Sequence, residues 1–304
     1  MKNVIKKVPI PLAGLILAFA TVGNLVQSYG AVYRNIFGSI AALLLLLLLI
    51  KLVTYPKDII EHLQNPIVAS VSPTFAMGLM ILSTYLKPYF PKAAFGMWVM
   101  GLILNIILII YFTKKFIFNF NIQRLFPSYF IVYVGIVAAS VTAPAYNQNS
   151  IGQAVFWFGF VLYLLLLPIV IYRVFVVKSI PEPAMPTIAI MAAPASLCLT
   201  GYLACFQAKD FSIVVFLGIL SFIMFLGVLL YLPKLLKLKF YPSFSSFTFP
   251  LAISAVAMKQ TNAYLLKLHK TLYLLNYIVK FQEILTIVII LYVLIKYLQF
   301  LFIE

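Results

Sequence analysis

The sequence predicts an all-α polytopic membrane protein with ten transmembrane helices in a single domain over residues 1–304. Of the 304 residues, 64% are hydrophobic and 9% are charged, and the mean hydropathy is +1.11. Soluble domains are about half apolar and about a quarter charged, so this composition excludes a soluble globular protein. A membrane-spanning helix needs about 20 apolar residues, which leaves room for ten spans with short connections. We expect the spans at 9–29, 33–53, 66–86, 93–113, 127–146, 151–173, 183–206, 211–232, 243–263 and 272–295.

Prolines divide the chain into five repeats of two spans each. Pro9, Pro66, Pro127, Pro183 and Pro242 stand at the starts of the odd-numbered spans, and their separations are 57, 61, 56 and 59 residues. A nearly constant period is the signature of a structural repeat, here one helical hairpin. The sequence therefore predicts five hairpins with pseudo-five-fold symmetry.

The two helices of each hairpin differ in polarity. The second helix is strongly apolar, as in the unbroken aliphatic run 43–50, whereas the first carries hydroxyl or amide groups. In chain order these polar residues are Thr21 and Asn24; Ser70, Ser72 and Thr74; Ser140 and Thr142; Ser196 and Thr200; Thr248 and Ser254. Four of the first helices also contain an interior proline: Pro73, Pro144, Pro194 and Pro250.

These features predict which helices lie inside the bundle. Hydroxyl groups, and carbonyl groups freed by proline, need partners that lipid cannot supply. We therefore expect the odd spans to form an inner ring around a central pore and the even spans to face lipid. The alternative, in which these residues only serve helix packing, stays open.

Basic residues predict the orientation. Fourteen of the 22 Lys and Arg residues lie at or beside the span ends that share a side with the two termini, and seven lie at the opposite ends. By the positive-inside rule, both termini are cytoplasmic and the protein lies in the cell (inner) membrane. This distribution explains the net charge of +16 without a nucleic-acid partner. Lys2, Lys6 and Lys7 before an apolar run also suggest a signal peptide, but the run continues past Ala20, so we expect it to be the first span.

Several motifs occur in a characteristic order along nearly the whole chain. They are Pro9-Ile10-Pro11, Glu61-His62 with Asn65-Pro66, Phe126-Pro127-Ser128-Tyr129, Pro181-Glu182-Pro183, Ala193-Pro194-Ala195 and Phe247-Thr248-Phe249-Pro250 followed by Leu251-Ala252. In these motifs the chain resembles the tellurite-resistance/dicarboxylate transporter family, whose bacterial TehA-like members are related to the plant slow anion channels. The chain departs from the family at Ile67-Val68-Ala69, where a basic residue is common after the proline of the third span.

The resemblance implies a fold, an assembly and a gate. It implies ten helices in five hairpins around a pore, homotrimers in which each protomer has its own pore, and a phenylalanine of the ninth helix that plugs it. By position in the motif this pore gate is Phe249. Phe247 lies two residues away, about 200° around the helix, so both rings cannot face the axis. Further candidates for pore lining or gate support are Phe247, Pro250, Pro194, Pro73, Thr21 and Thr200.

The chemistry of the remaining residues favours a conduit. Two cysteines, two histidines and six acidic residues carry no metal or catalytic motif, so we expect neither an enzyme nor a cofactor or metal. The central part of each predicted inner helix has no charged residue, which is typical of weak binding during conduction rather than of a proton relay. Lys280 and Glu283, three residues apart, should pair on the tenth span. The basic residues at the expected pore mouths are Lys57, Lys114, Lys115, Lys178, Lys234 and Lys237.

Three functional hypotheses follow. The first is an anion channel or channel-like uniporter for small inorganic or organic anions, including oxyanions such as tellurite. The second is a proton-coupled secondary transporter of C4-dicarboxylate or sulfite, in which Glu283 would be required. The third, an intramembrane enzyme or lipid-handling scaffold, needs polar residues clustered at one depth, and the sequence does not supply such a cluster.

Overall fold

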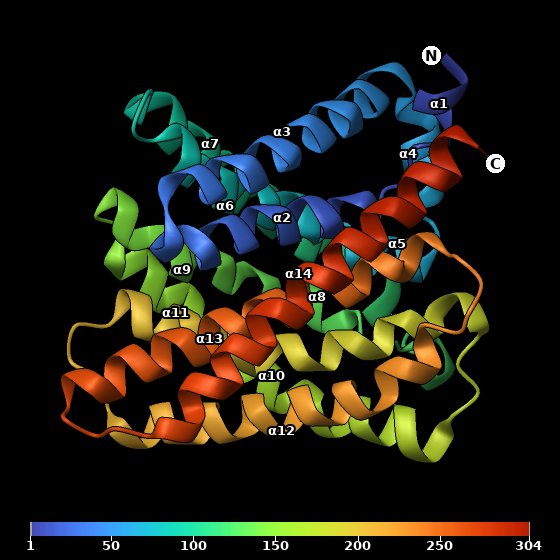
Figure 1. Cartoon of the computed structure of the whole chain (residues 1–304). Coiled ribbons are helices and arrows are strands. Elements are labelled where there is room, and N and C mark those ends of the chain that lie inside the picture. The colour runs from blue at the N-terminus through green and yellow to red at the C-terminus, as the bar shows by residue number, and fades with distance from the viewer. Residues whose placement is uncertain (1, 304) are drawn as a thin grey trace.

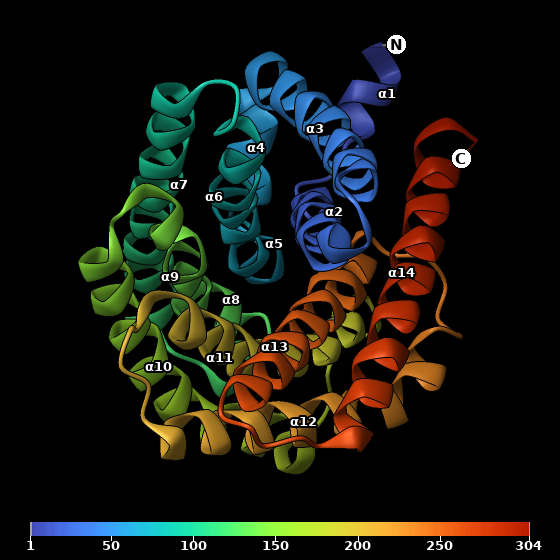
Figure 2. The same cartoon turned by 60° about the vertical axis from the view of Figure 1, so that its left-hand side comes forward.

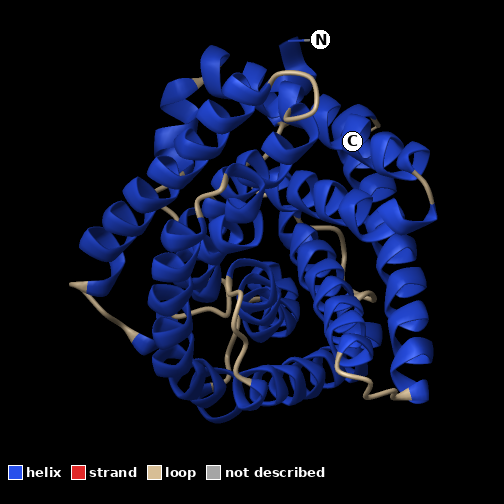
Figure 3. Ribbon diagram, turned by 90° about the vertical axis from the view of Figure 1, so that its left-hand side faces the viewer, coloured by secondary structure: helices blue, strands red, loops and turns tan. Residues whose placement is uncertain are grey.

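The structure is a computed structural model that describes residues 2–303, and these residues form helices and loops without a strand (Figure 3). The five outer helices are α3 (Ala31–Thr54), α7 (Pro91–Phe112), α10 (Asn149–Tyr172), α12 (Phe211–Leu235) and α14 (Tyr273–Phe302). The inner segments are α2 (Leu12–Val26), α5 (Pro66–Val71) with α6 (Pro73–Leu86), α8 (Tyr129–Val134) with α9 (Ala138–Thr142), α11 (Ala193–Cys205) and α13 (Thr248–Lys267). Two short helices, α1 (Lys2–Lys7) and α4 (Pro56–His62), lie outside the spans.

The inner segments form a closed ring. Contacts run from α2 to α6, on to α9, α11 and α13, and back to α2. Figure 2 shows α3, α7, α10, α12 and α14 outside this ring, each beside the inner helix of its own hairpin. The all-α fold of paired transmembrane helices is therefore confirmed. The pseudo-five-fold relation among the hairpins stays a prediction.

Burial separates the two rings. In the first four inner spans 72–83% of the residues are buried, against 22–33% in the five outer helices. The inner ring buries the hydroxyl-bearing residues, and Ser70, Ser140, Ser196, Thr200 and Thr248 are fully inaccessible. This agrees with the expectation that polar groups in a membrane protein face other protein segments.

The inner helices α6, α11 and α13 begin at or beside a proline, whereas the outer helices α10 and α12 continue through theirs. Pro73 begins α6, and Pro194 and Pro250 lie in the first turns of α11 and α13. A proline at a helix start removes only an amide hydrogen that has no partner within the helix. Before α11 and α13 the chain forms the 3₁₀ segments η7 (Glu182–Ala192) and η8 (Pro242–Phe247). Each of these two inner spans thus changes from 3₁₀ to α geometry close to its proline.

Two differences from the predicted spans have simple causes. The outer helices exceed their predicted limits, for example Pro91–Ile117 instead of 93–113, because Lys114 and Lys115 lie in a helical extension and long basic side chains can reach the membrane surface. Among residues 2–303, nine helical segments are long and apolar enough to span a membrane, and α13 is not one of them. Its second half, with Lys259, Gln260 and Asn262, is too polar, although the helix is 20 residues long.

Candidate functional site

The five inner segments meet at a small cavity on the axis of the ring. Its volume is about 30 Å³, which has room for one or two water molecules. All five inner segments contribute to its wall: Gly14; Val71, Thr74 and Met77; Phe130, Ile131, Val134 and Gly135; Ile190, Ala193, Pro194 and Leu197; Ser245, Ser246, Phe249 and Pro250. The wall is mostly apolar, and we call this region the axial constriction.

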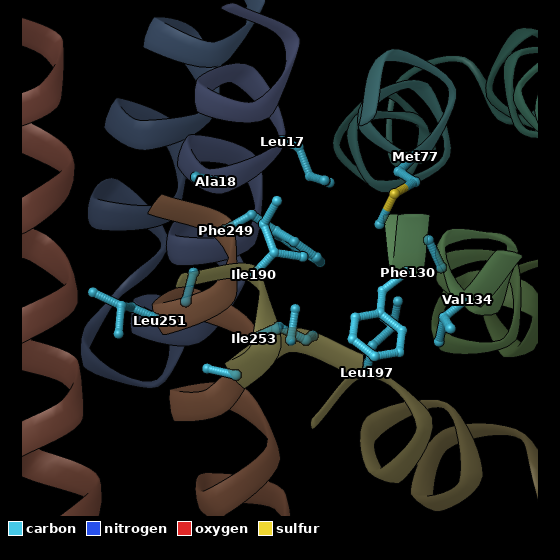
Figure 4. Close-up of a cluster of buried hydrophobic side chains, with 14 of the residues drawn as sticks. Leu17, Ala18, Met77, Phe130, Val134, Ile190, Leu197, Phe249, Leu251 and Ile253 are labelled. Carbon is cyan, nitrogen blue, oxygen red and sulfur yellow. The ribbon is translucent and has the colours of Figure 1, made fainter. Parts of the chain in front are cut away.

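Large side chains close the axial constriction. Figure 4 shows Phe249 from α13, Met77 from α6 and Phe130 from α8 pointing toward one another, beside Ile190 and Val134. Phe249 is 5% exposed, and Phe130 and Met77 are 1% exposed. An apolar constriction of this kind excludes ions by bulk and by dewetting.

Local hydrogen bonds fix the direction of Phe249. The Thr248 hydroxyl donates to the carbonyl oxygen of Ser245 at 2.6 Å, and the Ser254 hydroxyl donates to that of Pro250 at 2.8 Å. These bonds hold the first turn of α13, from which Phe249 projects into the cavity. Phe247 is fully buried away from the cavity wall, with its ring centroid 4.9 Å from that of Phe244. The two rings therefore lie on different sides of the chain, as expected from their spacing.

The other predicted site residues divide into two groups. Pro194 and Pro250 line the axial cavity together with Phe249. Pro73, Thr21 and Thr200 are buried but do not belong to the cavity wall. The two threonine hydroxyls donate within their own helices, Thr21 to the Leu17 carbonyl oxygen and Thr200 to that of Ser196, both at 2.8 Å.

Two wall residues had no distinguishing signal in the sequence. Phe130 follows the Phe126–Tyr129 motif, but one of 27 phenylalanines cannot be singled out by pattern alone. Ser246 lies in η8, is 5% exposed, and its hydroxyl has no hydrogen-bond partner among the described residues. An unpaired buried hydroxyl is costly unless a water molecule or ligand bonds it. Ser246 is therefore a donor available to a species in the axial cavity.

Glycines allow the ring to close around the cavity. A Cβ atom at Gly135 would lie 2.8 Å from the Met77 sulfur, and a Cβ at Gly14 would lie 3.1 Å from the Ser245 Cβ. Both positions belong to the cavity wall. The absence of a side chain at Gly135 thus lets Met77 reach the axis.

The predicted ion pair on the tenth span is wrong. Glu283 pairs with Lys259 of α13, Oε1 to Nζ at 2.7 Å, and Lys280 is exposed. Glu283 also accepts a hydrogen bond from the Tyr29 hydroxyl at 2.6 Å, and Lys259 donates to the Leu25 carbonyl oxygen at 2.8 Å. Burial explains the difference, because Glu283 points into the junction of α2, α13 and α14, where Lys259 is available.

The ring of interrupted inner segments around an axial constriction, with apolar helices outside it, defines a polytopic membrane channel or transporter. The sequence pattern of the SLAC1 family, described as voltage-dependent anion channels, matches residues 8–298. The chain belongs to this family, and the resemblance seen in its motifs is confirmed. Membership of a family described as anion channels makes anion transport the function to be tested for this chain.

One relative is an uncharacterized transporter of Methanocaldococcus jannaschii. The two sequences are 28% identical over 170 residues, which cover 49% of this chain and 48% of the relative. The chain thus matches about half the length of this protein. The name of this relative indicates transport and specifies no substrate.

Proposed function

We propose that the protein is an anion channel or channel-like uniporter, with a conduction path along the axis of the inner ring. The single observation that carries this proposal is the axial constriction itself, to which all five inner segments contribute and which Phe249 lines. In this proposal Phe249 is the gate, and a change of its rotamer together with movement of Met77 and Phe130 opens the path. Pro194 and Pro250 support the gate by lining the cavity beside Phe249, in the first turns of α11 and α13.

The substrate class follows from the available groups. The described residues place no acidic side chain in the constriction, and the Ser246 hydroxyl is a donor that an anion can accept from. The net charge of +16 favours anions near the protein. We infer small monovalent anions as the main substrates, with oxyanions such as tellurite among them.

Orientation and assembly complete the proposal. The excess of basic residues on the side of the termini supports an inner-membrane protein with both termini in the cytoplasm. We infer a homotrimer in which each protomer conducts through its own axis, as the family resemblance implies. Crosslinking in native membranes followed by denaturing electrophoresis tests this assembly, and a monomer under all conditions would contradict it.

The test of the function is a current measurement in planar bilayers with the purified Phe249→Ala variant, because the closed wild type should carry little current. Under a chloride gradient, the reversal potential should lie near the chloride equilibrium potential, and replacing chloride by nitrate should sustain the current. A reversal potential at the cation equilibrium value would contradict an anion channel. Tellurite should carry current or compete with chloride if oxyanions enter the same path.

A proton-coupled carrier of C4-dicarboxylate or sulfite is the second candidate. One observation favours it, namely that Glu283 is a buried carboxylate bonded to both Lys259 and Tyr29. A coupled carrier would accumulate dicarboxylate in liposomes under an imposed pH gradient, and Glu283→Gln would abolish this coupling. An anion current that is independent of pH and unchanged in Glu283→Gln would reject this candidate.

A further inference from the structure

A groove lies between the ends of two outer helices, away from the axial constriction. Its walls come from α10 with its extension η6 (Arg173–Val177), from α12, and from η7 beneath them. Its volume is about 660 Å³, within the range of ligand-binding pockets. The helix α12 and the extension of α10 end on the side of the molecule that holds both termini (Figure 1).

Two lysines stand at the mouth of this groove. Lys178 directly follows the extension of α10, and Lys234 lies in the last turn of α12. Both side chains are exposed, and neither has an acidic partner within residues 2–303. The Lys234 Nζ lies 5.3 Å from the ring centroid of Tyr231, an aromatic residue that also lines the groove. The mouth thus combines two unneutralised ammonium groups with a tyrosine at a helix end, where the membrane surface lies.

Below the mouth the groove is apolar and continuous. On α12, Ile223, Gly227, Tyr231 and Lys234 form one stripe with helical spacing, about 16 Å long at 1.5 Å per residue. Methionine side chains from η7 and α12 also line the groove, and such flexible side chains adapt to an acyl chain of variable shape. Ile223 is 55% exposed and Phe175 is 63% exposed, so the groove opens toward lipid rather than toward the axis.

A buried arginine supports the turn that presents Lys178. Lys178 and Ser179 both have a φ of 54°, a left-handed conformation that side chains rarely adopt. Arg173 is 1% exposed and donates hydrogen bonds to the carbonyl oxygens of Lys178 and Gln123. The turn is thus held in an unfavourable conformation by a specific buried contact, and Lys178 is placed over the groove.

We propose that this groove binds an anionic phospholipid, with its phosphate between Lys178 and Lys234 and one acyl chain along the Gly227 stripe. Charge complementarity selects the anionic headgroup, because basic pockets between transmembrane helices attract such lipids. The apolar part of the groove below the two lysines favours a ligand with an acyl chain over a free phosphate ion. This proposal concerns the outer ring and does not depend on the conduction path or on Phe249.

Native mass spectrometry of the delipidated full chain tests the proposal. Phosphatidylglycerol and phosphatidylcholine with the same acyl chains are titrated against wild type and against Lys178→Gln/Lys234→Gln. Each lysine near a lipid surface contributes about a five-fold change in affinity, so the double variant should bind phosphatidylglycerol roughly 25-fold more weakly. The control Lys209→Gln/Lys267→Gln removes equal charge at the opposite helix ends and should bind like wild type.

A second pair of variants tests the acyl chain. A Cβ atom at Gly227 or at Gly218 of α12 would meet no described atom within 4 Å, so the two positions are matched in the space around the backbone. Gly227→Leu fills the groove and should abolish the phosphatidylglycerol adduct, whereas Gly218→Leu, outside the groove, should keep it. Equal binding of both lipids by wild type, or undiminished phosphatidylglycerol binding by the lysine or Gly227 variant, would overturn the proposal. An oligomer that dissociates in Gly227→Leu with lipid binding unchanged would show instead that a second copy covers the groove.

Discussion

Two aromatic rings from different inner segments share the axial cavity, Phe249 of α13 and Phe130 of α8. Both are almost inaccessible, and both border a space of about 30 Å³. A gate built from one ring alone would leave the path partly filled after that ring moves. At the residue scale, we therefore expect closure of the path to depend on both rings, which no pattern in the sequence connects.

Phe130→Ala should increase anion conductance, because it removes bulk from the same cavity as Phe249. Each 1.4 kcal/mol taken from a barrier is a factor of about ten in rate, so we expect at least about a tenfold rise. Single-channel recording in planar bilayers measures this directly. Phe156→Ala, a fully buried aromatic of the outer helix α10, is the control and should leave conductance unchanged. A silent Phe130→Ala that folds normally would exclude Phe130 from the gate.

Gly135→Ala should reduce current in a Phe249→Ala background. The added methyl would lie 2.8 Å from the Met77 sulfur, so Met77 must shift within the cavity wall. Overpacking of this kind costs about 1–3 kcal/mol of unfolding free energy. Adding Met77→Ala should restore both the thermal midpoint and the current. No recovery in that variant would mean that the effect does not pass through Met77.

At the scale of elements, the pattern of prolines and hydroxyl residues predicts the inner and outer rings. Hydroxyl groups, and carbonyl groups freed by proline, need hydrogen-bond partners that lipid cannot supply. Pro73, Pro194 and Pro250 therefore predict both the location and the breaks of their helices. The pattern does not reveal what each side chain meets across the ring. Phe130 and Ser246 lie in segments more than 100 residues apart in the sequence. Only the assembled ring brings both residues to the wall of one cavity.

The junction of α13 with α14 contains an ion pair whose carboxylate is buried. Lys259→Met should destabilise the protein by about 3 kcal/mol, because Glu283 would remain as an unpaired buried carboxylate. This value is the lower end of the usual range because the Lys259 side chain is still 29% exposed. Thermal unfolding in detergent measures the loss, and Lys259→Met/Glu283→Leu should recover most of it. If the double variant is no more stable than Lys259→Met, the two residues are not energetically coupled.

A second ion pair, between the C-terminal end of α3 and the short helix α4, predicts a pH dependence. Lys51 of α3 donates to the Asp58 carboxylate of α4, and this hydrogen bond, aided by the positive charge, lowers the pKa of Asp58. Because the pKa is lower in the folded state than in the unfolded chain, the ionised Asp58 stabilises the fold. This stabilisation is complete above the ordinary carboxyl pKa near 4 and is lost as the pH falls through the lowered pKa. The difference in thermal midpoint between wild type and Asp58→Asn should therefore be constant from pH 7 to pH 5 and shrink below pH 4. A difference that persists at pH 2 would contradict this assignment.

At the scale of the whole molecule, the two rings meet different requirements, one for polar groups inside the protein and one for the surface in lipid. Interrupted inner segments bury their hydroxyl groups within the protein, and continuous outer helices provide the apolar surface that lipid needs. The chain order of inner and outer helices, and hence the fold class, could be predicted from period and polarity. The ion pair of Glu283 could not, because Lys280 and Lys259 are equally plausible partners until α13 is placed beside α14.

The most direct test of the account is the anion conductance of wild type, Phe249→Ala and Phe247→Ala in planar bilayers at two pH values. We predict a nearly silent wild type, a pH-independent chloride and nitrate current at least about tenfold larger in Phe249→Ala, and no increase in Phe247→Ala. Phe247 is the matched control because it is an equally buried ring in the same segment but lies outside the cavity wall. A folded Phe249→Ala with wild-type conductance, or an equal increase in Phe247→Ala, would contradict an axial path closed by Phe249.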